Sequence, residues 1–117
     1  MNINFKKRLE MESFRETVEN VVEALLQCIE ARMNARKAYG VRSGKITLTC
    51  TQLAQYLPNH YLTLNGTPKP NICVILMFIM EKLGISGQKR SNKRIYIFNI
   101  DQIPKTKEEI LKKVFGK

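Results

Sequence analysis

Apolar residues recur at helical spacing in the first long segment of the chain, residues 13–38, and predict one long helix. Ser13 and Glu16 fit a capping box at its start, and Gly40 is a suitable stop at its end. At 1.5 Å per residue this helix would be about 39 Å long, more than the width of so small a domain. Part of its apolar stripe is therefore expected to lie beyond the chain's own core and to support a homodimer. The residues of this stripe are Phe14, Val18, Val21, Leu25 and Ile29.

The middle of the chain alternates between strand-like and helix-like patterns. Residues 45–49 are β-branched at three of five positions, which is typical of a strand. Thr49 and Gln52 fit a second capping box and predict a short helix over residues 51–57 that ends at Pro58. After a turn-rich connection, residues 71–83 are apolar nearly all round a helix, a pattern typical of a helix buried at the centre of its domain.

The last third of the chain predicts a β-hairpin and a closing helix. Residues 85–90 and 93–100 are expected to form two strands around Ser91 and Asn92. Thr106 and Glu109 fit a third capping box, for a short C-terminal helix within residues 104–117. The elements predict an α+β fold, mostly helical, in a single domain over residues 1–117. Its parts are the long helix (13–38), a core (45–100) and the C-terminal helix (104–117).

The composition disfavours most hydrolytic and metal-dependent enzymes. The 117 residues include one histidine, one aspartate and no tryptophan, whereas such sites draw on several His and Asp side chains. His60 has no partner at ligand spacing. Cys28, Cys50 and Cys73 are expected to be small buried hydrophobes, with a disulfide or a catalytic thiol as the alternatives. We therefore expect a binding protein and not an enzyme, with no cofactor, metal or small-molecule ligand.

No segment is expected to cross a membrane or to direct secretion. The longest apolar run, residues 72–80, is far shorter than the roughly 20 residues that span a bilayer. At the N-terminus, further charged residues follow Lys6, Lys7 and Arg8 where a signal peptide would have its apolar core. The protein is therefore expected in the cytoplasm, associated with the nucleoid.

The positive charge is concentrated in one part of the chain. Lys and Arg number 20 against 10 Asp and Glu, a net charge of +10. Residues 31–100 hold 11 of the basic residues and a single acid, Glu81, so the whole excess lies there. Such segregation is typical of a protein that meets a polyanion. The alternative is a solvated face on a generally basic protein. The 11 residues are Arg32, Arg36, Lys37, Arg42, Lys45, Lys69, Lys82, Lys89, Arg90, Lys93 and Arg94.

The order of the elements resembles the winged helix-turn-helix family of DNA-binding domains. The resemblance is carried by residues 46–57 (ITLTCTQLAQYL), by the helix end at residues 80–85 and by the basic hairpin at residues 89–97, and it covers residues 13–100. It implies a winged helix-turn-helix with a long N-terminal helix, a basic β-hairpin wing and a short C-terminal helix. Its expected partner is double-stranded DNA.

The resemblance also implies which residues contact DNA. Helix 71–83 would present its N-terminal end to the major groove, with Lys69 and Asn71 at the groove edge and Thr67 able to reach a phosphate. The wing and its surroundings would supply the other contacts, namely Lys45, Lys89, Arg90, Ser91, Asn92, Lys93 and Arg94. The wing charges could instead only keep a hairpin soluble, and Asn71 could be a helix cap. Tyr96 and Phe98 are expected in the core rather than as platforms for bases.

Two departures from the family pattern change the expected mode of binding. The connection over residues 58–69 is longer than a tight helix-turn-helix turn, and helix 71–83 lacks Arg and Gln side chains for base contacts. We therefore expect binding led by phosphates, as in a transcriptional regulator or a DNA-associated accessory factor. The alternative is a protein-interaction module without nucleic acid, suggested by Val74 and Phe78 on the outer face of helix 71–83. RNA binding is weaker, because no aromatic pair on an open sheet is evident.

Overall fold

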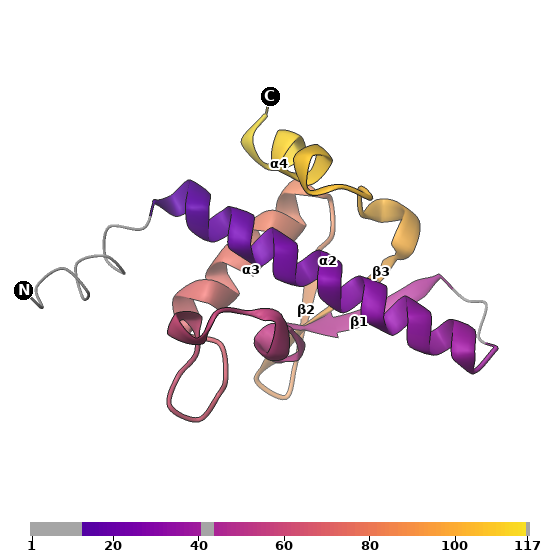
Figure 1. Cartoon of the computed structure of the whole chain (residues 1–117), viewed down its shortest axis with the longest axis horizontal. Coiled ribbons are helices and arrows are strands. Elements are labelled where there is room, and N and C mark those ends of the chain that lie inside the picture. Colours follow the sequence, from indigo (N-terminus) through magenta and orange to yellow (C-terminus); the bar gives the residue numbers. More distant parts are fainter. Residues whose placement is uncertain (1–12, 41–43, 117) are drawn as a thin grey trace, which may run out of the picture.

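The computed structural model describes residues 13–40 and 44–116. The basic residues Lys6, Lys7, Arg8 and Arg42 lie outside this part of the chain. Figure 1 shows the long helix α2 lying across the rest of the fold, with the sheet behind it. The elements in chain order are α2 (Phe14–Ala38), β1 (Lys45–Thr49), the 3-10 helix η1 (Cys50–Tyr56), η2 (Asn59–Tyr61), α3 (Pro70–Lys82), β2 (Gly87–Arg90), β3 (Lys93–Asn99), η3 (Ile100–Gln102) and α4 (Lys107–Phe115).

The fold is α+β, with a three-stranded antiparallel sheet in the order β1-β3-β2. Strand β1 pairs with β3 from Lys45 opposite Asn99 to Thr49 opposite Ile95. Burial alternates along β1, where Ile46 and Leu48 are fully buried and their neighbours are exposed or half-buried. This alternation places one face of the sheet on the core and leaves the other toward solvent. The α+β prediction and the positions of the three strands are confirmed.

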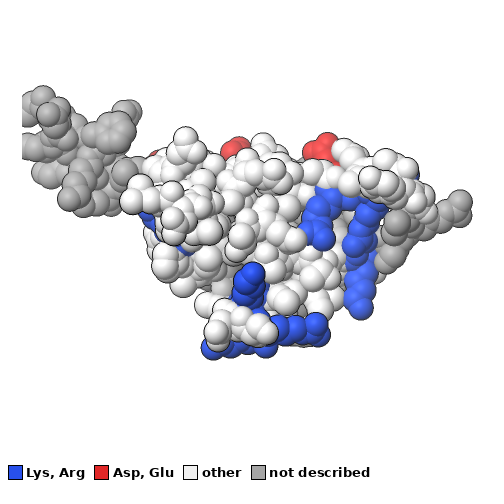
Figure 2. All heavy atoms as spheres, turned by 90° about the horizontal axis from the view of Figure 1, so that it is seen from below, with Lys and Arg blue, Asp and Glu red and all other residues white. Residues whose placement is uncertain are grey.

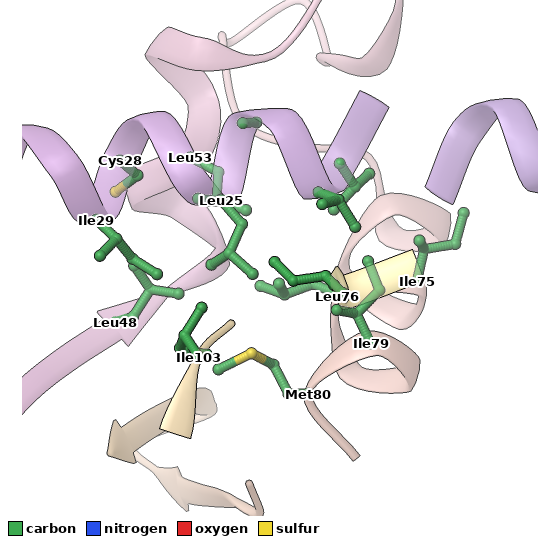
Figure 3. Packing of buried hydrophobic residues seen from close by; sticks show 14 of the residues in the cluster. Leu25, Cys28, Ile29, Leu48, Leu53, Ile75, Leu76, Ile79, Met80 and Ile103 are labelled. Carbon is green, nitrogen blue, oxygen red and sulfur yellow. The ribbon is translucent and has the colours of Figure 1, made fainter. Parts of the chain in front are cut away.

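The core lies between α2, the inner face of the sheet and α3. Figure 3 shows Leu25 and Ile29 of α2 pointing toward Leu48 of β1, with Leu76 of α3 close by. Ile103, in the connection to α4, closes the core from another side. The three cysteines are free, and Cys28 is buried in this core, as expected of a small apolar residue. Cys50 and Cys73 are only half-buried, so the prediction that they are buried is wrong for these two.

The apolar stripe of α2 is used within the chain itself. Val18, Val21 and Leu25 have no exposed surface and Ile29 is 5% exposed, because η1, α3, α4 and the sheet cover this face. The prediction that these residues form a dimer interface is therefore wrong for these four. Only Phe14, 53% exposed, remains accessible. The part of α2 that extends past the core is its polar C-terminal end, after Met33.

The three predicted helix starts have the expected cap contacts. The Glu16 amide donates to Ser13 Oγ at 3.0 Å, and the Glu109 amide donates to Thr106 Oγ1 at 3.2 Å. The Thr49 amide donates to Gln52 Oε1 at 2.9 Å, although the helix that follows is a 3-10 helix. An ion pair joins helix α4 to α2, with Lys107 Nζ 2.8 Å from Glu23 Oε1.

The connection between η1 and α3 contains structure that the sequence analysis treats as loop. Asn59–Tyr61 forms η2, and a β-bridge between Leu62 and Pro68 closes the loop that follows. Helix α3 then begins with Lys69 as its N-cap and Pro70 in its first turn. Asn71 therefore lies inside the helix, and its alternative role as a cap is wrong.

Candidate nucleic-acid interface

The β2–β3 hairpin turns through Ser91 and Asn92 alone. Both residues have positive φ, 48° and 66°, the backbone that a two-residue type I′ turn requires. Asparagine tolerates this conformation better than most residues, whereas serine does so less readily. A two-residue turn fixes the register of the strands, so that Arg90 lies opposite Lys93 and Lys89 lies opposite Arg94.

The four basic residues at the hairpin tip face one another as two like-charged pairs. All four are exposed, and none makes an ion pair with a carboxylate in residues 13–40 or 44–116. Arg90 Nη2 donates only a long hydrogen bond, 3.4 Å, to Gln88 Oε1. Like charges directly opposite each other in a sheet destabilise it. The tip is therefore a dense, uncompensated positive charge that folding alone does not require.

Arg94 is positioned by the hairpin backbone. A Cβ atom on Gly87 would lie 2.6 Å from Arg94 Cγ and 3.0 Å from Tyr96 Cε1. The absence of a side chain at Gly87 thus lets the stem of Arg94 lie flat over β2, beside the Tyr96 ring.

A hollow of about 360 Å³ lies between the hairpin, the start of η1 and the outer face of α3. It places the hairpin tip beside the first turns of α3, where Cys73 and Val74 lie. Asn71, three residues before Val74, is exposed on the same side of the helix. The lining residues are Thr49, Cys50, Thr51, Cys73, Val74, Met77, Asn92, Lys93, Arg94 and Tyr96.

Two titratable groups in the wall of this hollow are held in their neutral forms. Burial, partly offset by the nearby Arg94, raises the pKa of the Tyr96 hydroxyl to about 12. Burial and, secondarily, the neighbouring Cys73 thiol raise the pKa of the Cys50 thiol well above its usual range. Cys50 is therefore a poor nucleophile, which argues against the alternative of a catalytic thiol at this position.

The outward face of α3 is mainly apolar. Val74 is 58% exposed, and Phe78 contacts Phe14 edge-to-face with ring centroids 5.4 Å apart. Phe14 also meets Phe115 at the end of α4, at 6.5 Å. Hydrogen-bonding side chains that could read base edges are therefore scarce along this helix, with Asn71 the main exposed amide.

The structure separates some of the predicted contact residues from the hairpin. Lys45 lies opposite Asn99, at the end of β3 away from the turn, so that roughly 20 Å of strand lie between it and Lys93. The grouping of Lys45 with the hairpin is wrong for this reason. The Thr67 hydroxyl is hydrogen-bonded to the Thr63 hydroxyl at 2.8 Å and closes the loop before α3. Lys69 is half-buried at the helix start, where its amide donates to the Tyr61 carbonyl at 2.9 Å.

Lys and Arg side chains form two groups on one face of the molecule. Figure 2 shows one group at the lower edge, where the hairpin lies, and another below the C-terminal half of α2, with uncharged surface between them. The acidic side chains visible in this view lie along the upper edge. The basic residues in the C-terminal half of α2 belong to the charged segment 31–100 but are not among the residues predicted to contact DNA. They are Arg32, Arg36 and Lys37.

The described part of the chain has neither a membrane-spanning helix nor a cluster of metal ligands. No helix there is both long and apolar enough to cross a bilayer. No group of three or more His, Cys, Asp or Glu side chains is placed to hold a metal ion among those residues. Comparison of the chain with known protein families, with curated proteins and with solved structures finds no match.

Proposed function

We propose that this protein is a winged-helix DNA-binding protein, a transcriptional regulator or a DNA-associated accessory factor, that binds duplex DNA mainly through phosphates. The observation that supports this most strongly is the hairpin tip, where Lys89, Arg90, Lys93 and Arg94 face one another without a carboxylate partner in the described residues. The order of elements, with α3 followed directly by this hairpin, fits the winged-helix arrangement.

A role of these cations in solubility alone leaves their mutual pairing unexplained. Charges that discourage edge-to-edge pairing belong on an edge strand, and Lys89 and Arg90 do lie on the edge strand β2. Lys93 and Arg94 lie on the central strand β3, just beyond the residues that pair with β1. Their placement at the protruding end of the hairpin, opposite two further cations, suits contact with a polyanion better than protection of an edge.

The expected mode of binding follows from the chemistry of the two elements. The hairpin offers cations, which bind phosphate oxygens in any sequence. Helix α3 offers mainly apolar side chains beside one exposed amide, Asn71, so base discrimination should be modest. The second basic group, at the end of α2, lies on the same face in Figure 2 and would extend the contact along the duplex.

The salt dependence of duplex binding tests this proposal. If six to eight cations meet phosphates, the logarithm of the binding constant should fall with the logarithm of salt concentration with a slope of about −5 to −7. Replacing Lys89, Arg90, Lys93 and Arg94 by Gln should reduce the size of that slope by about 3 to 4. At 0.15 M salt the same variant should bind about a thousandfold more weakly, by the same relation.

A control variant of equal net charge makes this test specific. Lys82, Lys105, Lys112 and Lys113 are exposed and lie away from the hairpin in sequence, and their replacement by Gln also removes four charges. We expect this control to keep most of the slope. Equal losses in both variants, or no binding of either protein at low salt, would contradict the proposal.

A second function, as a protein-interaction module, is favoured by one observation. Val74 and Phe14 are 58% and 53% exposed, which is unusual for large apolar side chains and typical of a partner surface when they are grouped. The two functions are separated by Val74→Gln, which adds no charge beside Lys93 and Arg94 and should abolish capture of a protein partner after nuclease treatment. The same change should leave the salt slope of DNA binding nearly unaltered.

A further inference from the structure

We propose that the hollow between the hairpin, η1 and α3 binds a small carboxylate with a compact apolar body. Three features of its wall meet there: an apolar floor, a hydroxyl donor without a partner, and two cations. The carboxylate group of the ligand would accept a hydrogen bond from the hydroxyl and pair with the cations. Its apolar body would pack on the apolar floor. The proposal goes beyond DNA binding, because it needs no nucleic acid.

The size and lining of the hollow suit a small ligand. Its volume of about 360 Å³ lies within the range of roughly 300–1,000 Å³ found for ligand pockets. Cys50, Cys73, Val74 and Met77 give it an apolar and polarisable floor. No carboxylate lines it in the described part of the chain.

Tyr96 supplies the second observation. It is only 2% exposed, and its hydroxyl forms no hydrogen bond with any described residue. Buried tyrosine hydroxyls usually have a partner. Among the described residues, every fully buried side-chain nitrogen or oxygen has a hydrogen-bond partner. The Tyr96 hydroxyl has none, so it must keep a little contact with solvent. Since Tyr96 lines the hollow, we place that contact there. A tyrosine hydroxyl is protonated at neutral pH and can act as a donor there.

The charge of the wall selects an anion. Lys93 and Arg94 both line the hollow, and Gly87 leaves room for the stem of Arg94 beside the Tyr96 ring. The nearest opposing charge is Glu81 of α3, which acts on Tyr96 electrostatically but does not line the hollow. A neutral hydroxyl donor beside two cations is a recognised arrangement for charge-assisted hydrogen bonds to a carboxylate.

Occupation of the hollow would affect DNA binding, and this consequence rests on the proposed function. Lys93 and Arg94 are counted among the phosphate contacts, so a bound carboxylate would compete with DNA for the same side chains. Binding of the carboxylate to the protein is measured without DNA. Failure of the ligand proposal is therefore distinguishable from failure of the DNA-binding proposal.

The test uses 1-naphthoate as the probe and 1-naphthalenemethanol as its neutral counterpart. The chain has no tryptophan, so naphthalene fluorescence can be followed without interference from the protein. Naphthoate should bind saturably and shift the methyl resonance of Met77 in the full-length protein. The neutral alcohol should bind at least tenfold more weakly, because it cannot make charge-assisted hydrogen bonds.

Two variants locate the ligand head. Tyr96→Phe should weaken naphthoate binding about tenfold and leave binding of the alcohol less affected. Lys93→Gln combined with Arg94→Gln should remove the preference for the anion. Lys112→Gln combined with Lys113→Gln, which removes two charges from α4, should leave naphthoate binding unchanged. Equal binding of both probes, an unshifted Met77 methyl, or equal effects of the hairpin and α4 variants would each overturn the proposal.

Discussion

The two ends of strand β3 differ in burial and charge. Near its C-terminal end Tyr96 and Phe98 are 2% and 3% exposed and are packed among core residues. At its N-terminal end Lys93 and Arg94 are exposed and face two further cations across the hairpin. Burial explains the first end as a contribution to folding. The second end opposes folding through charge repulsion, so its residues are better explained by what they contact outside the chain.

The largest expected effect is on the buried end. Phe98→Ala should lower the free energy of unfolding by about 3–5 kcal/mol, because it leaves a cavity where the ring packs against the core. Chemical denaturation followed by circular dichroism measures this loss. Lys93→Ala, at the other end of the strand, should change the stability by no more than about 0.5 kcal/mol. Similar losses for both would remove the distinction between the two ends.

An intermediate effect is expected at high pH. The pKa of Tyr96 is about 12 in the folded chain, against an ordinary value of 10.0. Between these values the unfolded chain releases a proton that the folded chain keeps, so stability is fully present below pH 10 and is lost as the pH rises toward 12. The loss should be about 2–3 kcal/mol. Denaturation of the native chain and of Tyr96→Phe across this range measures it, since the other titrations are common to both and Tyr96→Phe should lack this part of the decline.

The smallest effect in stability is the sharpest test of the charged end. Arg90→Glu places a carboxylate opposite Lys93 and turns a repulsive pair into an attractive one. The free energy of unfolding should rise by about 0.2–1 kcal/mol. Binding to duplex DNA should nevertheless fall, because a phosphate contact is replaced by a negative charge. A variant that is less stable, or that binds DNA as well as the native chain, would contradict the interpretation of this end.

The sequence predicts the elements of this fold well and their partners less well. Strand and helix positions follow from local signals, such as the Thr106 cap and the short two-residue turn. The spacing of Val18, Val21 and Leu25 shows that α2 has an apolar face, but it does not show what covers that face. The sheet, η1, α3 and α4 cover it, and these contacts join residues far apart in the chain.

The candidate site was predictable in part for the same reason. The hairpin cations stand close together in the sequence, so their clustering follows from the turn alone. The hollow cannot be predicted from the sequence in this way, because Cys50, Cys73 and Tyr96 come from three separate elements and meet only in the folded chain. Lys45 shows the converse error, since charge counting along the sequence ignores the register that moves it to the far end of β3.

The two-residue turn at Ser91 and Asn92 would affect the rate of the DNA binding that we propose. A two-residue turn has little conformational freedom. The backbone that carries the four cations therefore needs no ordering when a polyanion binds. Little backbone entropy is then lost on contact, and the hairpin is preorganised for its encounter. Association should be limited by diffusion and steering and not by a conformational step, so its rate should depend steeply on ionic strength.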